Sequence, residues 1–470
     1  MEQIKRFILF LRLTGAVARL AVSLGTTAIR HKLTTASKSS SFPPLGPGEE
    51  PKNVAIIGAS FAGVWAARQL HGALPPGYRL VVIEPHSHFH FTWVFPRFCV
   101  LEGHEKKAFI PYYLKGVSDA HAEAAAAREP RGGDLESAEK KPNGQLRWIQ
   151  GRATSLTKSS ITVQLVGESE ATEEVPYTHL LIATGAMSKE KSYRETGGLP
   201  SRMIENDRAA AARRMKEMQQ RIKSSKRIVI VGGGAAGVEL ATDAATRHNI
   251  TDEGSGKKIV VVHSRSAPMH RFGPRLQKAA LDGLKKVGVE VVLEDRVVGD
   301  IEDGMVSLKS GKTVECDFLI DCAGQKPASS ILSPLAPQCL TDSGHIKIRP
   351  TLQLDDDEFP NIYSCGDVAD TKFPTPNGRS ASVQAGIAAE NIFSSVWGKE
   401  PTSKYVPSWV DGHIKLTLGL EDCVLHFGDE NNTELLFPKK DGPTLMAEDA
   451  WRKMGAKPYE GIDDAEKPKL

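Results

Sequence analysis

Short apolar runs, each preceded by a charged residue and followed by glycine, recur along this chain of 470 residues. The run Val54–Ile57 ends at Gly58, and the run Ile228–Val231 ends at Gly232. Continuous apolar runs of this length are typical of strands buried on both faces of a parallel sheet. The pattern therefore predicts two α/β units with parallel sheets.

The first unit has the sequence of a nucleotide-binding loop. Gly58 follows the strand and makes a tight turn, and Gly63 lets the helix Val64–Leu70 pack closely on the sheet. Backbone N–H groups at the start of that helix offer a site for a pyrophosphate. Ser60 stands where a third glycine is usual, and its small side chain still allows a close backbone approach. The alternative is an ordinary strand–turn–helix.

A second apolar strand, Leu80–Ile83, ends at Glu84. A carboxylate at this position can accept hydrogen bonds from both ribose hydroxyls of an adenosine. Together, the loop and Glu84 predict a complete dinucleotide site in the first unit.

The second unit repeats the pattern with Gly232, Gly234 and Gly237 all present. Two such loops imply two nucleotides, one that donates electrons and one that accepts them, and so predict an electron-transferring flavoprotein. The next strand ends at His263 without a carboxylate, and Arg265 follows. Because arginine can pair with a phosphate in fork geometry, we expect NADPH to be accepted at least as well as NADH. The alternative is that Arg265 is a solvated loop cation.

The pattern of apolar and polar residues in the rest of the chain predicts further strands and helices of an α/β fold and a small C-terminal sheet. A flexible insertion is expected at 116–145, and alternating runs from about residue 404 predict the C-terminal sheet. Strands or strand-to-turn segments are expected at Leu146–Thr154, Ser160–Leu165, Tyr177–Gly185, Gly288–Leu293, Cys316–Gly324 and Phe359–Asp370, and a helix at Ser382–Phe393.

The N-terminal segment differs in charge from the rest. Residues 3–48 contain no Asp or Glu but several Lys and Arg residues, with apolar positions near one helical face. A spanning helix would bury two arginines, which costs about 2.5–3.5 kcal/mol each. The pattern fits either a mitochondrial presequence or a helix lying in a membrane interface. The net charge of +3 arises from this segment, so nothing in the body indicates a nucleic-acid surface.

Two further groups could carry chemistry. His86, His88 and His90 alternate, as on one side of a strand, but no Cys or carboxylate pattern completes a metal set, so we expect no metal site. The six cysteines include no Cys-x-x-Cys pair, and the helix after the first glycine loop has none. Disulfide chemistry is therefore not expected.

The order of these motifs resembles flavoproteins with two dinucleotide-binding domains. The likeness covers about residues 53–395 and includes Ala183-Thr184-Gly185, Ala323-Gly324 and Gly366-Asp367. Within that superfamily the chain is similar to apoptosis-inducing-factor-like oxidoreductases of the AMID or ferroptosis-suppressor type, and to type II NADH:quinone dehydrogenases. Gly-Val-Glu-Leu-Ala at 237–241 and Pro96-Arg97 carry this closer resemblance.

The resemblance implies roles for individual residues. We expect Glu239 to lie near the nicotinamide as the catalytic residue, Asp367 to bind the ribityl chain, and Arg97 to reach the FAD phosphates. Gln384 and Ala385 are expected at a helix N-terminus beside the flavin. The full expected FAD set is Gly58, Ser60, Phe61, Ala62, Gly63, Glu84, Arg97, Ala153, Thr184, Gly185, Asp367, Gln384 and Ala385. The expected NAD(P)H set is Gly232, Gly234, Gly237, His263, Arg265 and Gly324.

These observations predict an α/β fold in which an FAD domain is split around an inserted NAD(P)H domain. The expected divisions are 1–52 (targeting segment and linker), 53–195 and 326–398 (FAD), 196–325 (NAD(P)H) and 399–470 (C-terminal α+β cap). The expected function is FAD-dependent hydride transfer from NADPH or NADH to a quinone-like acceptor. Alternatives are a redox tailoring enzyme and a flavin-containing scaffold. A mitochondrial or membrane location is expected, with a cytoplasmic one as the alternative.

Overall fold

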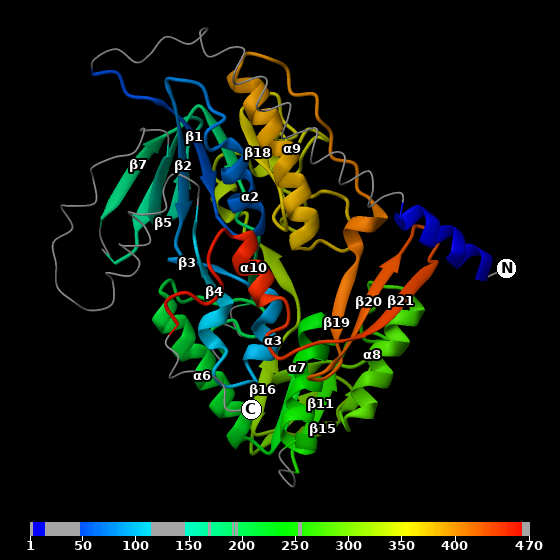
Figure 1. Cartoon of the computed structure of the whole chain (residues 1–470). Coiled ribbons are helices and arrows are strands. Elements are labelled where there is room, and N and C mark those ends of the chain that lie inside the picture. Colours follow the sequence, from blue (N-terminus) through cyan, green and yellow to red (C-terminus); the bar gives the residue numbers. More distant parts are fainter. Residues whose placement is uncertain are drawn as a thin grey trace.

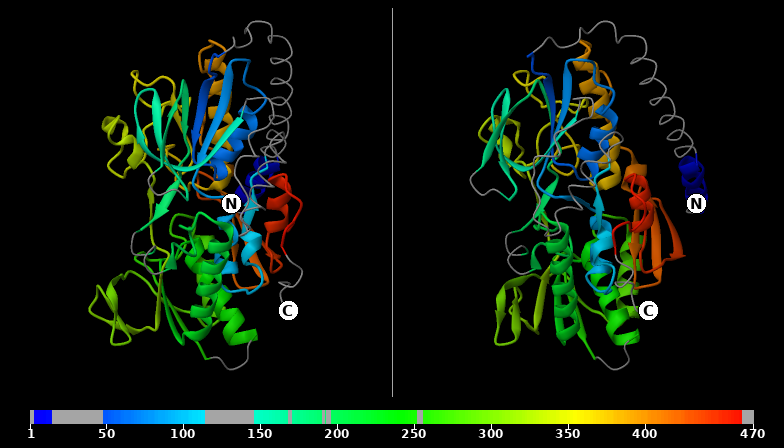
Figure 2. Two further views of the ribbon diagram at one scale, coloured as in Figure 1. Left: turned by 90° about the vertical axis from the view of Figure 1, so that its left-hand side faces the viewer. Right: turned by 60° about the vertical axis from the view of Figure 1, so that its left-hand side comes forward.

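A computed structural model describes residues 3–14, 48–113, 146–167, 171–189, 192, 196–251 and 256–462. Two α/β units lie end to end, and a small C-terminal sheet lies beside them (Figures 1 and 2). The expected insertion at 116–145, the linker at 34–48 and residues 15–32 of the N-terminal segment fall, apart from residue 48, outside the described residues.

The first unit is built on a seven-stranded sheet in the order β18-β8-β1-β2-β5-β6-β7. Five of its strands, β18, β8, β1, β2 and β5, pair in parallel. The first four of these are short apolar runs, and almost all their central residues are buried. Because β18 comes from beyond the second unit, the chain leaves this sheet and returns to it, which confirms the split fold. The strands are β1 (Lys52–Ile57), β2 (Tyr78–Glu84), β5 (Leu146–Leu156), β6 (Ser160–Leu165), β7 (Thr172–Pro176), β8 (His179–Ile182) and β18 (Ile362–Ser364).

Two helices cover one face of this sheet. Helix α2 (Phe61–Leu70) and helix α9 (Gly378–Val396) pack together mainly through alanines in one buried cluster. Helix α9 begins four residues before the expected start at Ser382. Its true N-cap is Asn377, whose side chain accepts hydrogen bonds from the amides of Arg379 and Ser380.

The second unit has a four-stranded parallel sheet in the order β12-β11-β10-β16. Its strands again match the expected apolar runs, and a three-stranded antiparallel sheet adjoins it. The elements are α6 (Arg208–Ser224), β10 (Arg227–Val231), α7 (Ala235–Ala245), β11 (Lys258–Val262), α8 (Pro274–Lys286), β12 (Glu290–Val292) and β16 (Phe318–Asp321). The adjoining sheet comprises β13 (Val297–Glu302), β14 (Met305–Leu308) and β15 (Thr313–Glu315).

Short elements join the two units. Strands β9 (Ala186–Ser188) and β17 (Gln325–Pro327) pair antiparallel where the chain passes between the sheets. A second small ribbon, β3 (His88–His90) with β4 (Phe109–Pro111), flanks the short helix α3 (Phe95–Phe98). The side chains of α3 pack against the second unit in one continuous core.

The C-terminal part forms the expected small sheet. Strands β19 (Ile414–Thr417), β20 (Asp422–Gly428) and β21 (Glu434–Lys440) are antiparallel, and helix α10 (Ala447–Lys453) follows. Trp451 of α10 is fully buried, and its Nε1–H donates to the Lys107 carbonyl at 2.9 Å. This part therefore joins the core of the molecule.

Residues 3–14 form a helix that rests on the C-terminal sheet (Figure 1). Leu9 and Leu13 are buried against Leu435, and the Arg12 guanidinium binds Glu430 at 2.7 Å and Asp429 at 3.3 Å. Among the described residues, no helix is both long enough and apolar enough to cross a bilayer.

Candidate functional site: a cavity shared by both glycine loops

One cavity of about 1740 Å³ runs between the two units and the C-terminal sheet. Both glycine loops and most of the expected site residues line it. From the expected FAD set these are Gly58, Ser60, Phe61, Ala62, Glu84, Ala153, Thr184, Gly185 and Asp367. From the expected NAD(P)H set they are Gly232, Gly234, His263, Arg265 and Gly324, and the expected catalytic residue Glu239 lines the cavity as well. A cavity shared by the two loops allows two nucleotides to meet.

The first loop is shaped by close backbone contacts. Gly58 has φ +92°, and a Cβ there would lie 2.6 Å from the Ala183 carbonyl oxygen. Gly63 does not line the cavity but faces the backbone of the loop, where a Cβ would lie 1.7 Å from the Gly58 carbonyl oxygen. Gly63 thus lets α2 approach the loop, and the amides at the start of α2 open into the cavity. This cradle fits a pyrophosphate.

Glu84 is buried at the end of β2, and both of its carboxylate oxygens have partners. Oε2 accepts from the Ala59 amide at 2.6 Å, and Oε1 accepts from the His86 amide at 3.0 Å and lies 2.5 Å from His86 Nδ1. Burial alone would raise the pKa of Glu84, but His86 and the two amides outweigh it, so the pKa is lowered. The carboxylate is therefore ionised and oriented before any adenosine binds.

The second loop repeats this geometry. Gly232 has φ +110°, and a Cβ on Gly237 would lie 2.0 Å from the Gly232 carbonyl oxygen. Gly237 therefore lies behind the cavity wall, like Gly63, and holds α7 against the loop.

Arg97 does not have the expected position at the cavity. Its guanidinium is buried between the two units: Nε donates to Asp243 Oδ2 of α7 at 2.7 Å. Its remaining nitrogens donate to the carbonyls of Gly419, Leu420 and Gly442. Because each of its three nitrogens donates to one of these partners, the structure does not support the expected contact with the FAD phosphates.

Gln384 and Ala385 are also displaced from their expected place. Because α9 begins at Gly378, both lie in its second turn, where they are buried and do not line the cavity. Gln384 Oε1 accepts from the Gly366 amide at 2.8 Å, so it supports the turn that carries Asp367. The residues of the helix start that do line the cavity are Pro376, Asn377, Gly378 and Arg379.

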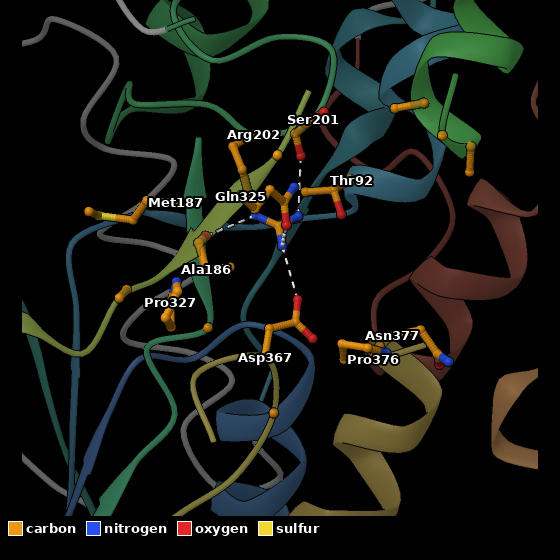
Figure 3. A pocket seen from close by; sticks show the side chains of 18 of the residues that line it. Thr92, Ala186, Met187, Ser201, Arg202, Gln325, Pro327, Asp367, Pro376 and Asn377 are labelled. Carbon is orange, nitrogen blue, oxygen red and sulfur yellow. Dashed lines mark hydrogen bonds and ion pairs between the residues drawn. The ribbon is translucent and has the colours of Figure 1, made fainter. Parts of the chain in front are cut away.

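Arg202 is a cavity residue that the sequence reasoning missed. Its guanidinium lies 3.2 Å from Asp367 Oδ2 and donates to the Ala186 carbonyl and to Gln325 Oε1 (Figure 3). Arg202 thus joins the β9–β17 ribbon to the carboxylate after β18. No local motif marks it, because its partners come from distant parts of the chain.

Aromatic side chains form part of the wall near the start of α9. The rings of Phe61 and Trp93 stack at 5.0 Å, and the Arg379 guanidinium lies over Trp93 at 4.7 Å. Cation–aromatic contacts of this kind hold a charged side chain in a defined place. This wall lies where α2 and α9 both meet the cavity.

Glu239 lines the cavity from α7, and its Oε1 accepts from the Thr417 amide of β19 at 3.1 Å. Burial raises the pKa of Glu239 to about 8; neighbouring Asp243 also raises it, while Thr417 and Arg97 act in the opposite direction. The carboxyl is therefore mostly protonated at pH 7, and the α7–β19 junction holds an available proton.

The histidines and cysteines have no arrangement that marks a second reactive centre. Within the described part of the chain, no three His, Cys, Asp or Glu side chains are grouped to hold a metal ion. The rings of His86 and His90 lie 4.2 Å apart. All six cysteines are free thiols; Cys322 lines the cavity, and burial raises its pKa.

Known proteins have sequences related to this chain over most of its length. Fe-regulated protein 8 of Mycosarcoma maydis is 31% identical over 391 residues, which cover 80% of this chain and 88% of that protein. Ferroptosis suppressor protein 1 of Mus musculus is 27% identical over 418 residues, covering 86% and 96%. Apoptosis-inducing factor homolog B of Dictyostelium discoideum is 24% identical over 396 residues, covering 80% and 89%.

Solved structures agree on the fold. The reduced Bacillus anthracis CoADR-RHD matches with a TM-score of 0.58 at 19% identity, over 83% of this chain and 63% of that one. An engineered water-forming NADPH oxidase bound to NADPH matches with a TM-score of 0.58 at 17% identity, over 81% and 76%. The expected fold class is thereby confirmed. The expectation of FAD and a nicotinamide dinucleotide as cofactors is confirmed by the family to which the chain belongs. The profile of the pyridine nucleotide-disulphide oxidoreductase family matches residues 52–389, and the chain belongs to that family as a relative of the ferroptosis-suppressor and apoptosis-inducing-factor proteins.

Proposed function

We propose that this protein passes a hydride from NAD(P)H through FAD to a quinone-like acceptor. The observation that carries the proposal is that the start of α9 with the segment before it, strand β19 and the segment before α10 add apolar side chains to the cavity wall, beside Lys372, Arg379 and Lys415. We call this part of the wall the apolar end of the cavity. Phe373, Ile414, Leu445 and Met446 line this end, and none of them belongs to a glycine loop. An apolar surface beside the two nucleotide sites fits a flat, uncharged acceptor.

The residues of the first unit would hold FAD. The amides after Gly58 would bind the pyrophosphate, Glu84 the adenosine ribose, and Asp367 the ribityl chain, with Arg202 poised beside Asp367. When bound, FAD would supply the redox chemistry, by accepting a hydride and passing its electrons on. The chain's own residues therefore have to bind the reactants and hold them in the reactive orientation. The start of α9 adds partial positive charge at this place.

Glu239 would supply a proton at the acceptor end. Reduction of a quinone to a hydroquinone takes up one hydride and one proton. The hydride originates from NAD(P)H, and a carboxyl that is mostly protonated at pH 7 can donate the proton. The Thr417 amide holds that carboxyl against β19, the strand that also contributes Ile414 to the wall. We therefore assign Glu239 as the catalytic residue.

Steady-state NAD(P)H oxidation with a panel of acceptors tests this function. Short-chain benzoquinones and naphthoquinones should be turned over well, and glutathione disulfide should not. A tailoring enzyme would instead turn over poorly with all quinones but rapidly with one dedicated substrate. A scaffold would oxidise NAD(P)H slowly with every acceptor, and either result would contradict the proposal.

The N-terminal helix supports a position at a membrane surface, in a mitochondrion or elsewhere, over a purely cytoplasmic one. While Leu9 and Leu13 face the C-terminal sheet, Ile4 is 65% exposed and Phe7 is 63% exposed. Exposed apolar side chains beside Lys5, in a segment without acids from residue 3 to 48, fit the interface of an anionic bilayer. A lipophilic acceptor would be concentrated at the same surface.

A further inference from the structure

The two nucleotide units are structural repeats that can be compared position by position. In the first, Ile57 pairs with Ile83 in parallel register; in the second, Val231 pairs with Val262. The next residue in each unit, a glycine with positive φ, donates to the partner strand at 2.9 Å: Gly58 to Ile83 and Gly232 to Val262. The residues that follow these positions are therefore equivalent.

This equivalence places His263 where the first unit has Glu84. The Ala59 amide donates to Glu84 Oε2 at 2.6 Å, and the matching Gly233 amide donates to His263 Nδ1 at 3.0 Å. Nδ1 must present a lone pair to receive this N–H, so in the neutral ring the proton is on Nε2. Burial, then His270 and Arg265, lower the pKa of His263, so the ring is neutral at pH 7.

The exchange of a carboxylate for this imidazole changes which ribose the site accepts. Glu84 is an anion that can accept hydrogen bonds from two ribose hydroxyls and would repel a phosphate on that ribose. His263 has no negative charge, and its other nitrogen is a donor. At the adenosine ribose, the second unit therefore lacks the charge that excludes a 2′-phosphate.

Cationic side chains surround this position. Arg265, Arg271 and Arg296 all line the cavity, and the ring of His270 lies 5.3 Å from that of His263. The described residues give none of the three guanidinium groups an ion pair or a side-chain hydrogen bond. Arg265 and Arg271 come from the loop after β11, and both act electrostatically on the His270 ring, while Arg296 immediately precedes β13.

Two acids, Asp295 and Asp300, also line the cavity. The carboxylate of Asp295 accepts from the Ser310 hydroxyl at 2.5 Å and from the amides of Ser310 and Arg296. These bonds turn it toward the β13–β15 sheet. Asp300 also lines the cavity but is exposed at its rim.

We propose that the carboxyl end of β11 is a binding site for the 2′-phosphate of NADPH, with Arg265 as its main ligand and His263 as the residue that permits it. This inference deepens the proposed function by naming the electron donor, and it rests on that function only in taking the second nucleotide to be a nicotinamide dinucleotide. A single well-placed guanidinium contact to phosphate should favour the phosphorylated ligand by about 10- to 100-fold.

Binding of nucleotide fragments to the FAD-loaded full chain tests the proposal without turnover. Isothermal titration should show 2′-AMP binding at least about 10-fold more tightly than 5′-AMP, and NADP⁺ more tightly than NAD⁺. Arg265→Gln should remove most of that preference. Arg213→Gln, which removes an exposed charge on α6 in the same unit, is the matched control and should leave it unchanged.

His263→Glu provides the reciprocal change. A glutamate at position 263 still accepts a hydrogen bond from the Gly233 amide, and it gives the second unit the carboxylate that Glu84 provides in the first. The variant should therefore fold, retain flavin and favour NAD⁺. Equal binding of 2′-AMP and 5′-AMP to the wild type would overturn the proposal, as would an equal loss in Arg265→Gln and Arg213→Gln. Because these fragments need no electron acceptor, failure to reduce quinones would leave this result standing.

Discussion

Glu239→Gln should separate electron transfer from proton transfer at the apolar end of the cavity. The Glu239 side chain is half-buried in the cavity wall, and its Oε1 accepts from the Thr417 amide at 3.1 Å. Glutamine has the same size and keeps an acceptor for Thr417, but it has no acidic proton. The substitution therefore tests the proton alone, with little change in packing.

The magnitude follows from the pKa, which burial raises from 4.5 to about 8. About 90% of the carboxyls are then protonated at pH 7 and about 10% at pH 9. Quinone reduction by the wild type should fall about tenfold per pH unit above 8. An unfolded chain would release this proton near pH 4.5, so the folded state binds the extra proton between about pH 4.5 and 8, and its stability falls as pH rises through that window.

The assay compares two acceptors across pH. Ferricyanide takes electrons without protons, so its reduction by Glu239→Gln should match the wild type. Quinone turnover should drop about 100-fold or more and lose its alkaline decline. Equal loss with both acceptors would refute the proton role and assign Glu239 to positioning the nicotinamide. A quinone profile that still declines above pH 8 would show that another group supplies the proton.

Two further changes address the cofactor and the membrane. Asp367→Ala should purify with reduced flavin absorbance, because the ribityl hydroxyls lose their acceptor, whereas the exposed Asp342→Ala should keep full flavin; full occupancy in both would contradict the role of Asp367. Removal of residues 1–32 should shift the protein from the membrane fraction to the soluble fraction, with Phe7→Glu in the full chain giving the same shift; an intact chain found wholly in the soluble fraction would oppose the membrane proposal.

The parallel strands and both glycine loops could be predicted from the sequence because their cause is local. A strand buried on both faces has to be a continuous apolar run, as in β1 and β10. At positions 63 and 237 a Cβ would lie 2.0 Å or less from the carbonyl oxygen of the first loop glycine, so only glycine fits there. Residue identity alone therefore carries this part of the site.

The residues that were misplaced or missed depend on distant partners. The start of α9 was placed late because Gly378 and Arg379 show no apolar period, while its cap is a single asparagine. Arg97 matches a family motif, but its direction is decided by Asp243, which lies 146 positions further on. Arg202 contacts Asp367 only in the folded chain, in which β9 and β17 pair. No pattern within one segment reports such pairings.

The buried Arg97–Asp243 pair has a consequence for the shared cavity. Arg97 belongs to α3 of the first unit, Asp243 to α7 of the second, and the carbonyls that complete its shell to the C-terminal part. Moving the two units apart would break this pair together with the hydrogen bonds from Arg97 to the carbonyls of Gly419, Leu420 and Gly442. Arg97 therefore ties the first unit, the second unit and the C-terminal part together at one buried point, and so helps to set how the walls of the shared cavity face one another before a dinucleotide or an acceptor binds.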